Sequence, residues 1–128
     1  MATTDVQQLT SGVPKVIDPK THAVLDYLVA GTFLTAGMVL RRRNARASGL
    51  AFANGIAVLG ATLFCDYPGG VWPLFSFKTH GLLDAMQAAL AGAGPALLGF
   101  ASEPEAQFFH GQAVSEVGVI AATDFAAA

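Results

Sequence analysis

Two histidine–aspartate pairs are the residues of this chain best suited to chemistry. The heptapeptides at residues 20–26 and 78–84 share five of their seven residues, and each places a His four positions before an Asp: His22 with Asp26, and His80 with Asp84. Residues four apart share one face of an α-helix, so each pair can act together. An imidazole beside a carboxylate can hold a defined tautomer or ligate a metal.

The resemblance between the two stretches extends beyond the heptapeptide at the same offset of 58 residues. The further aligned pairs are Asp18 with Ser76, Gly60 with Gly118, Asp66 with Asp124, and Tyr67 with Phe125. This pattern predicts a tandem duplication and therefore a pseudo-symmetric fold. We expect a polar N-terminal arm at residues 1–17, a first helical hairpin repeat at 18–70 and a second at 71–128, all within one domain.

Composition favours a membrane protein. Hydrophobic residues make up 53% of the 128-residue chain and charged residues 12%, against about 25% charged residues in an average soluble domain. Mean hydropathy is +0.51. The net charge of −2 excludes nucleic acid as a partner, because no basic face could neutralise phosphates.

Four apolar segments predict the architecture. They cover about residues 22–40, 47–65, 80–101 and 108–122, and the first three approach the roughly 20 residues that cross a bilayer core. Asp18 before Pro19 is a helix-start pattern, and Ser76 holds the matching place in the second copy. We expect an all-α integral membrane four-helix bundle, made of two tandemly duplicated helical hairpins.

Basic residues predict the orientation. Arg41, Arg42, Arg43 and Arg46 lie between the first two apolar segments, and the positive-inside rule places such a connection in the cytoplasm. We therefore expect a multi-pass protein of the bacterial inner (cytoplasmic) membrane, with both termini on the non-cytoplasmic side.

Several of these motifs are similar to those of a known family. A Lys-Thr-His-x-x-Leu-Asp opening of a helix, its repeat, and a second helix that ends at residues 65–68 (Cys-Asp-Tyr-Pro) resemble the SPW-repeat family of small bacterial membrane proteins. The stretch that matches the family's Ser-Pro-Trp keeps Pro95 and the Gly99–Phe100 ending but lacks the Trp. The resemblance implies a duplicated helix-hairpin membrane fold and carries over no chemistry.

In the predicted topology, polar groups gather at one end of the bundle. The starts of the first and third helices meet the ends of the second and fourth, so two histidines and four aspartates converge there. These are His22, His80, Asp26, Asp84, Asp66 and Asp124. Further polar positions are expected inside the membrane, and these are Asn54, Gln87, Gln112 and Glu116.

The His/Asp pairs allow several interpretations. The preferred one is structural: each Asp fixes the tautomer of its His and closes polar contacts between helices. Alternatively, His22 and His80 could ligate a haem or a chlorin from two sides. A metal ion could be held by His22, Asp26, His80 and Asp84. Glu116 with the aspartates could move protons or ions.

No sequence motif of an enzyme accompanies these residues, and no extramembrane segment is long enough for a substrate pocket. We therefore expect a small non-catalytic membrane protein, an accessory subunit whose partners are the lipid bilayer and other membrane-protein subunits. The alternative is a cofactor-bearing membrane protein that uses the His/Asp pairs to hold haem, chlorin or a metal.

Overall fold

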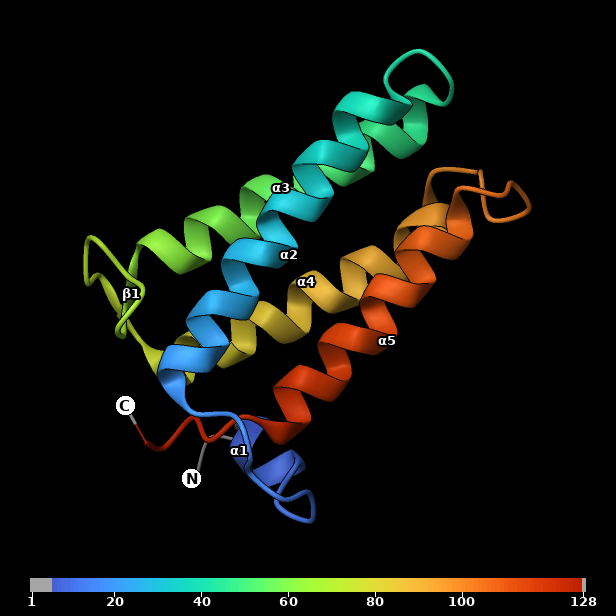
Figure 1. The fold of residues 1–128 in the computed structure, drawn as a ribbon. Helices are drawn as coiled ribbons and strands as arrows, with labels where there is room; N and C mark the ends of the chain where they lie inside the picture. The colour runs from blue at the N-terminus through green and yellow to red at the C-terminus, as the bar shows by residue number, and fades with distance from the viewer. Residues whose placement is uncertain (1–5, 128) are drawn as a thin grey trace.

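The protein is predominantly helical in a computed structural model, which describes residues 6–127 (Figure 1). In chain order the elements are α1 (Val6–Leu9), α2 (Pro19–Leu40), α3 (Ala45–Leu63), β1 (Cys65–Asp66), β2 (Phe75–Ser76), α4 (Phe77–Leu97) and α5 (Ala106–Ala122).

The four long helices form two antiparallel hairpins. Helix α2 packs along α3, and α4 packs along α5, while α3 also contacts α4 (Figure 1). The α2–α3 and α4–α5 connections lie at one end of the molecule, and both termini with α1 lie at the other (Figure 1). The first turns of α2 and α4 therefore meet at the end that carries the termini.

Short parallel strand pairings link the two hairpins. In the β1–β2 pair, Cys65 lies opposite Phe75 and Asp66 opposite Ser76. A separate parallel bridge joins Ile17 to Thr123. Adding 58 to the residue number aligns Cys65 with Thr123 and Ile17 with Phe75. The Ile17–Thr123 bridge is therefore the pseudo-symmetric counterpart of the Cys65–Phe75 pairing. The tandem repeat predicted from the sequence is thus visible in how the halves are joined.

The ends of the helices follow local side-chain chemistry. The Asp18 carboxylate accepts a hydrogen bond from the Thr21 amide at the start of α2, and Ser76 does the same for Thr79 at the start of α4, as N-cap residues do. Helix α4 ends just before Gly99, whose positive φ of 80° suits a residue without a Cβ. Helix α5 begins with no side-chain cap.

Two buried clusters hold the helices together. The one nearer the helix connections is centred on Phe33, Phe100 and Phe109, packed among small residues such as Ala51 and Ala91. The other lies near the termini and includes Cys65, Tyr67, Phe77 and Phe125. This second cluster surrounds the first turns of α2 and α4, where the His/Asp pairs lie.

The expectation of an all-α bundle of four membrane-crossing helices is wrong. Among residues 6–127, α2 is the one helix that is both long and apolar enough to cross a membrane, a criterion that the buried core helix of a soluble protein can also meet. The fold also contains the small parallel sheet and the short helix α1. Helix α5, with 17 residues, is too short. Helices α3 and α4 fall short because polar groups such as Arg46, Asn54, His80 and Gln87, together with Gly, lower their mean hydropathy.

The predicted multi-pass membrane arrangement is therefore not supported, although the protein is mostly helical as predicted. Within the described part of the chain one possible membrane-crossing helix remains, and it carries the first His/Asp pair near its start.

Candidate metal site

The two His/Asp pairs form one buried cluster between α2 and α4. We refer to His22, Asp26, His80 and Asp84 as the His/Asp cluster. All four side chains are buried, with His22 1% and His80 0% exposed. The ligand-type atoms of the four residues lie within 4.8 Å of one another. The repeat thus brings together two pairs that are 58 residues apart in sequence.

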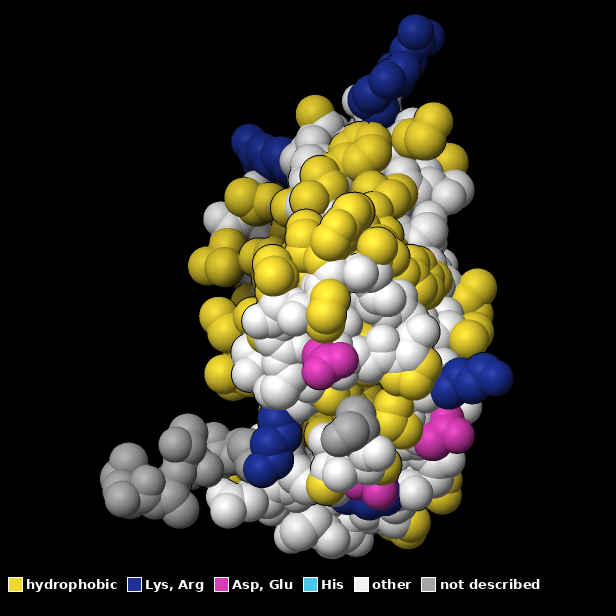
Figure 2. Space-filling view, turned by 90° about the vertical axis from the view of Figure 1, so that its left-hand side faces the viewer, with side chains coloured by type: hydrophobic (Ala, Val, Ile, Leu, Met, Phe, Trp, Pro, Cys, Tyr) yellow, Lys and Arg dark blue, Asp and Glu magenta, His cyan; other side chains and the backbone are white. Residues whose placement is uncertain are grey.

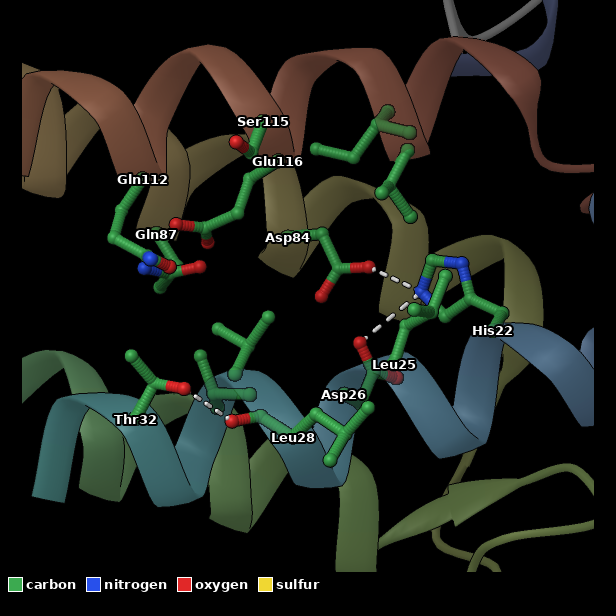
Figure 3. Close-up of a pocket in the computed structure, with 14 residues that line it drawn as sticks. His22, Leu25, Asp26, Leu28, Thr32, Asp84, Gln87, Gln112, Ser115 and Glu116 are labelled. Carbon is green, nitrogen blue, oxygen red and sulfur yellow. Dashed lines mark hydrogen bonds and ion pairs between the residues drawn. The ribbon is translucent and has the colours of Figure 1, made fainter. Parts of the chain in front are cut away.

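Each imidazole faces both carboxylates. The Nε2 atom of His22 lies 3.3 Å from Asp26 Oδ1 and 2.9 Å from Asp84 Oδ2, contacts that Figure 3 marks with dashed lines. The Nε2 atom of His80 lies 2.9 Å from Asp26 Oδ2 and 3.2 Å from Asp84 Oδ1. The contacts between repeats are shorter than those within one helix, so the cluster also links the two hairpins.

The opposite edge of each imidazole fixes where its proton lies. The Nδ1 atom of His22 is 2.8 Å from the Thr123 hydroxyl, which itself donates to the carbonyl of Val119. The Nδ1 atom of His80 is 3.0 Å from the carbonyl oxygen of Ala61. The Ala61 carbonyl can only accept a hydrogen bond, and the Thr123 hydroxyl already donates its proton to Val119. Both Nδ1 atoms are therefore hydrogen-bond donors.

With Nδ1 protonated, a neutral imidazole presents a lone pair at Nε2. Both of these lone pairs would then point at carboxylate oxygens, an arrangement that needs a positive charge between them. His80 Nε2 is the clearer case, because this buried atom receives no hydrogen bond of acceptable geometry despite its short distances to Asp26 and Asp84. Either a proton on each imidazole or one shared cation provides that charge.

The metal-free cluster favours the proton. Burial alone would lower the pKa of His80, but the carboxylates of Asp26 and Asp84 outweigh it and raise the pKa to about 12. Two imidazolium and two carboxylate groups sum to zero net charge. Two neutral imidazoles, two carboxylates and one divalent cation also sum to zero. The cluster can therefore exchange its protons for a metal without leaving a buried charge unbalanced.

The four side chains are close enough to share one metal ion after rearrangement. The four Nε2-to-oxygen distances of 2.9–3.3 Å use both oxygens of each carboxylate, so they describe a ring of ion pairs between imidazoles and carboxylates. A tetrahedral ion would instead take one atom from each residue and separate these atoms by roughly 3.3–3.4 Å; here such atoms lie within 4.8 Å of one another. The hydrogen bonds from both Nδ1 atoms match the outer contacts that orient metal-ligating histidines.

The aspartates have support of their own. Tyr67 donates from its hydroxyl to Asp26 Oδ2 at 2.9 Å. Burial and the neighbouring Asp26 carboxylate raise the pKa of Tyr67, so the phenol keeps its proton and remains a donor. The rings of Tyr67 and Phe77 flank His80, and those of Phe77 and Phe125 flank His22. These aromatic walls limit the access of water to the cluster.

A haem or chlorin fits this geometry poorly. The imidazole rings of His22 and His80 have centroids 5.3 Å apart at 80° to each other. Both Nε2 atoms already contact Asp26 and Asp84, and a flat macrocycle bound between them would have to displace both carboxylates. The arrangement favours a single ion over a tetrapyrrole.

The predicted convergence of four aspartates is only half right. Asp26 and Asp84 belong to the cluster, whereas Asp66 is exposed in β1 opposite Ser76. Asp124 lies beyond the end of α5, and its carboxylate accepts from Gln7 and from the amide of Ala126. Both residues point away because the strand pairings redirect the chain after α3 and α5.

The other predicted polar residues lie next to the cluster. The Gln87 amide donates to Asn54 Oδ1 at 2.7 Å and so joins α4 to α3, and Asn54 donates to the carbonyl of Leu50. Figure 3 shows Gln87, Gln112 and Glu116 gathered on the far side of a cavity from His22. We refer to this cavity of about 220 Å³ as the polar cavity; Asp26 and Asp84 also line it.

Glu116 is the least satisfied polar group in the polar cavity. It is 8% exposed, and its Oε2 atom has no hydrogen-bond partner. Burial raises the pKa of Glu116 to about 7; a hydrogen bond with Gln87 opposes the shift, and the nearby Asp84 and Asp26 carboxylates add to it.

Sequence reasoning missed Thr123 and the hydroxyl of Tyr67. The sequence identifies Tyr67 only as an aromatic match to Phe125. The available signal was the offset itself, since it aligns Cys65 with Thr123 at the positions that follow α3 and α5.

Comparisons with known proteins identify no relative: no family model, curated protein or solved structure matches the chain. The similarity to the SPW-repeat family stays a prediction.

Proposed function

We propose that the protein binds one divalent transition-metal ion through His22, Asp26, His80 and Asp84. The observation that carries the proposal is the direction of the two imidazoles: both donate from Nδ1, so both Nε2 atoms point at the carboxylates. His80 Nε2 is fully buried between the carboxylates of Asp26 and Asp84, at 2.9 and 3.2 Å, where a metal could replace its proton.

The ligand set narrows the choice of metal. Two imidazole nitrogens and two carboxylate oxygens suit Zn²⁺, Fe²⁺ or Mn²⁺ better than Ca²⁺ or Mg²⁺, which prefer all-oxygen sites. Protein Zn²⁺ sites most often have four ligands, and this set supplies four. Zinc is therefore the probe of choice for the first experiment.

Isothermal titration of the chelator-treated protein with Zn²⁺ tests the proposal. We expect one ion per chain, and we expect His80→Gln and Asp84→Asn to weaken binding by at least about 100-fold, because each removes one of four ligands. His110→Gln and Asp66→Asn are matched controls, since both residues are exposed and lie outside the cluster. Circular dichroism confirms that each variant is folded.

The structural interpretation predicts a different result. If the cluster serves only as a buried set of ion pairs, no form of the protein binds Zn²⁺ with this stoichiometry, and the cluster variants lose only stability. Equal zinc affinity in His80→Gln and the unaltered protein would also contradict the proposal.

We also propose that the protein works at a lipid bilayer, as an accessory partner of other membrane proteins. The support is the apolar outer surface of the helices. Figure 2 shows hydrophobic side chains spread over the middle of one face, with basic side chains at the end near the α2–α3 connection and others, some beside acidic side chains, toward the opposite end. Exposed apolar residues of the long helices include Val24, Leu28, Ile56, Met86 and Val114.

The charge distribution supports an orientation for this proposal. Arg41, Arg42 and Arg43 are exposed at one end of α2, the helix that could cross a membrane. By the positive-inside rule that end would face the cytoplasm of a bacterial inner membrane, and the termini at the other end of the molecule would face away from it.

Flotation of the expressed protein with bacterial membrane vesicles tests bilayer association. We expect the protein to float with lipid after a carbonate wash and to require detergent for extraction. Replacing Val24 and Leu28 of α2 with Ser should release it, while the same change at Leu9 and Val16, which are exposed outside the long helices, should not. Recovery in the soluble fraction without detergent would contradict bilayer association and leave the zinc test unaffected.

A further inference from the structure

The tandem repeat creates two equivalent cavities, one on each side of the His/Asp cluster. The second, which we call the apolar cavity, also contains Asp84 and Gln87 but is otherwise lined mainly by hydrophobic side chains. An offset of 58 relates many of the residues that line the two. The pairs are Ala57 and Ser115, Val58 and Glu116, Ala61 and Val119, Leu83 and Leu25, Met86 and Leu28, and Leu90 and Thr32.

The two cavities have diverged in chemistry. Where the apolar cavity has Ala57, Val58 and Leu90, the polar cavity has Ser115, Glu116 and Thr32. A buried carboxylate in place of Val is costly unless something pairs with it. The substitution therefore marks the polar cavity as the one of the two that holds a polar molecule.

Glu116 is the anchoring group of this cavity. Its side chain projects from α5 into the space between α5 and α2, close to Gln87 and Gln112 (Figure 3). Gln87 forms a hydrogen bond with the Glu116 carboxylate, while the Oε2 atom of Glu116 is buried without a hydrogen-bond partner. The Oε2 atom of Glu116 therefore lacks a hydrogen-bond donor.

The charges around the cavity favour a cationic donor. The His/Asp cluster balances to zero both with its own protons and with a divalent metal, and so leaves the negative charge of Glu116 uncompensated. Among the described residues, no Lys or Arg lines the polar cavity. The remaining walls are mainly apolar, with Leu25, Leu28, Val29, Val58 and Ile120 among them.

We propose that the polar cavity binds a small organic ammonium ion, with its charged nitrogen on Glu116 and its apolar body against α2 and α5. A volume of about 220 Å³ accommodates a molecule of the size of benzylamine, since one water takes roughly 30 Å³. A few convergent polar groups in an apolar pocket are typical of small-molecule sites. This binding function goes beyond the proposed metal site and does not depend on it.

Titration with benzylamine, monitored by protein NMR at pH 8, tests the proposal. Benzyl alcohol has nearly the same size and shape without the charge. We expect benzylamine to bind with shifts confined to residues around Glu116, and benzyl alcohol to bind at least about tenfold more weakly, because charge-assisted hydrogen bonds are the stronger ones.

Two variants assign the binding to Glu116. Glu116→Gln keeps the size of the side chain and removes its charge, and Glu116→Val restores the residue of the apolar cavity. Both should weaken benzylamine binding at least about tenfold. Leu90→Gln places an amide in the apolar cavity and should leave binding unchanged.

Equal affinity of the unaltered protein and Glu116→Gln for benzylamine would overturn the proposal. So would equal affinity for the amine and the alcohol, or no binding of the amine by the unaltered protein. Because neither Glu116 variant removes a residue of the His/Asp cluster, zinc titration of the same samples separates a failure of this proposal from a failure of the metal site.

Discussion

Thr123 and Cys65 occupy equivalent positions in the two repeats, and each interacts with the histidine of the other repeat. Thr123 contacts His22 Nδ1 through its hydroxyl. Cys65 interacts with His80, whose Nδ1 also reaches the carbonyl of Ala61. Each histidine is therefore contacted by a residue that follows the last helix of the opposite repeat, and His80 is also held by Ala61 within α3. The cluster is complete only when both repeats are folded together.

This relationship predicts the effect of Thr123→Val. The change removes the acceptor for the buried His22 Nδ1–H while keeping the shape of the side chain. We expect the free energy of unfolding to fall by about 1–3 kcal/mol. Zinc affinity should fall by roughly 10- to 100-fold, as for other outer contacts of metal-ligating histidines. Urea denaturation and zinc titration measure the two effects. Thr123→Ser keeps a hydroxyl and should behave like the unaltered protein; equal losses in both variants would show that the hydroxyl is not what orients His22.

Tyr67→Phe isolates the hydrogen bond to Asp26. The ring and its contacts with Phe77 and His80 stay in place, while the hydroxyl that donates to Asp26 Oδ2 is lost. A hydrogen bond to a charged group contributes about 1.5–3 kcal/mol, so we expect a loss in that range by chemical denaturation. Tyr27→Phe is the matched control: its hydroxyl donates to the carbonyl of Gly69 at the surface, and its loss should cost clearly less. The role assigned to Tyr67 does not survive if the two variants lose the same stability.

Gly70→Ala tests the close packing of the turn between α3 and β2. A Cβ at this position would overlap the carbonyl oxygen of Cys65, and a backbone atom cannot move aside as a side chain can. Because Cys65 lies beside His80, we expect both a destabilisation of about 1–3 kcal/mol and weaker zinc binding. Gly118→Ala in α5 meets no atom within 4 Å and should stabilise the protein by about 0.5–1 kcal/mol. Thermal unfolding and zinc titration of the two variants check the contrast, and a stable Gly70→Ala protein with normal affinity would refute it.

The repeat was the part of the structure that the sequence predicted best. The shared heptapeptide placed His22 and His80 at equivalent positions, and the caps Asp18 and Ser76 followed from residue type alone. The helix spacing correctly put each His beside its own Asp. It could not show that the shorter contacts run between repeats, because those depend on how the two hairpins pack.

Two parts of the prediction failed for physical reasons. Asp66 and Asp124 were expected at the cluster because the ends of their helices lie at the same end of the bundle as the His/Asp pairs, whereas the parallel pairings at Cys65 and Thr123 turn the chain away. The four membrane-crossing helices were predicted from the lengths of four apolar segments. Helix α5 has 17 residues and is too short, and polar groups lower the hydropathy of α3 and α4, so α2 is the one described helix that is long and apolar enough.

Glu116 predicts a pH dependence of stability. Its pKa is about 7 in the folded protein, against 4.5 for an unperturbed glutamate. Between these values the unfolded chain has lost the proton and the folded protein still holds it, so stability falls as pH rises through this window. The slope from this one group is at most about 1.4 kcal/mol per pH unit. Above pH 7 both states are ionised and the contribution of Glu116 levels off.

Other groups near Glu116 also titrate, so the test is a difference between two proteins. Asp26 and Asp84 face Glu116 across the polar cavity, and the histidines titrate in the unfolded chain near pH 6.5. Subtracting the stability of Glu116→Gln from that of the unaltered protein, each by urea denaturation from pH 4 to 8, leaves the part due to Glu116. We expect the difference to fall steadily between about pH 4.5 and 7. A difference that is constant over that range would mean that Glu116 ionises in the folded protein as an exposed carboxyl does, and that burial does not govern its charge.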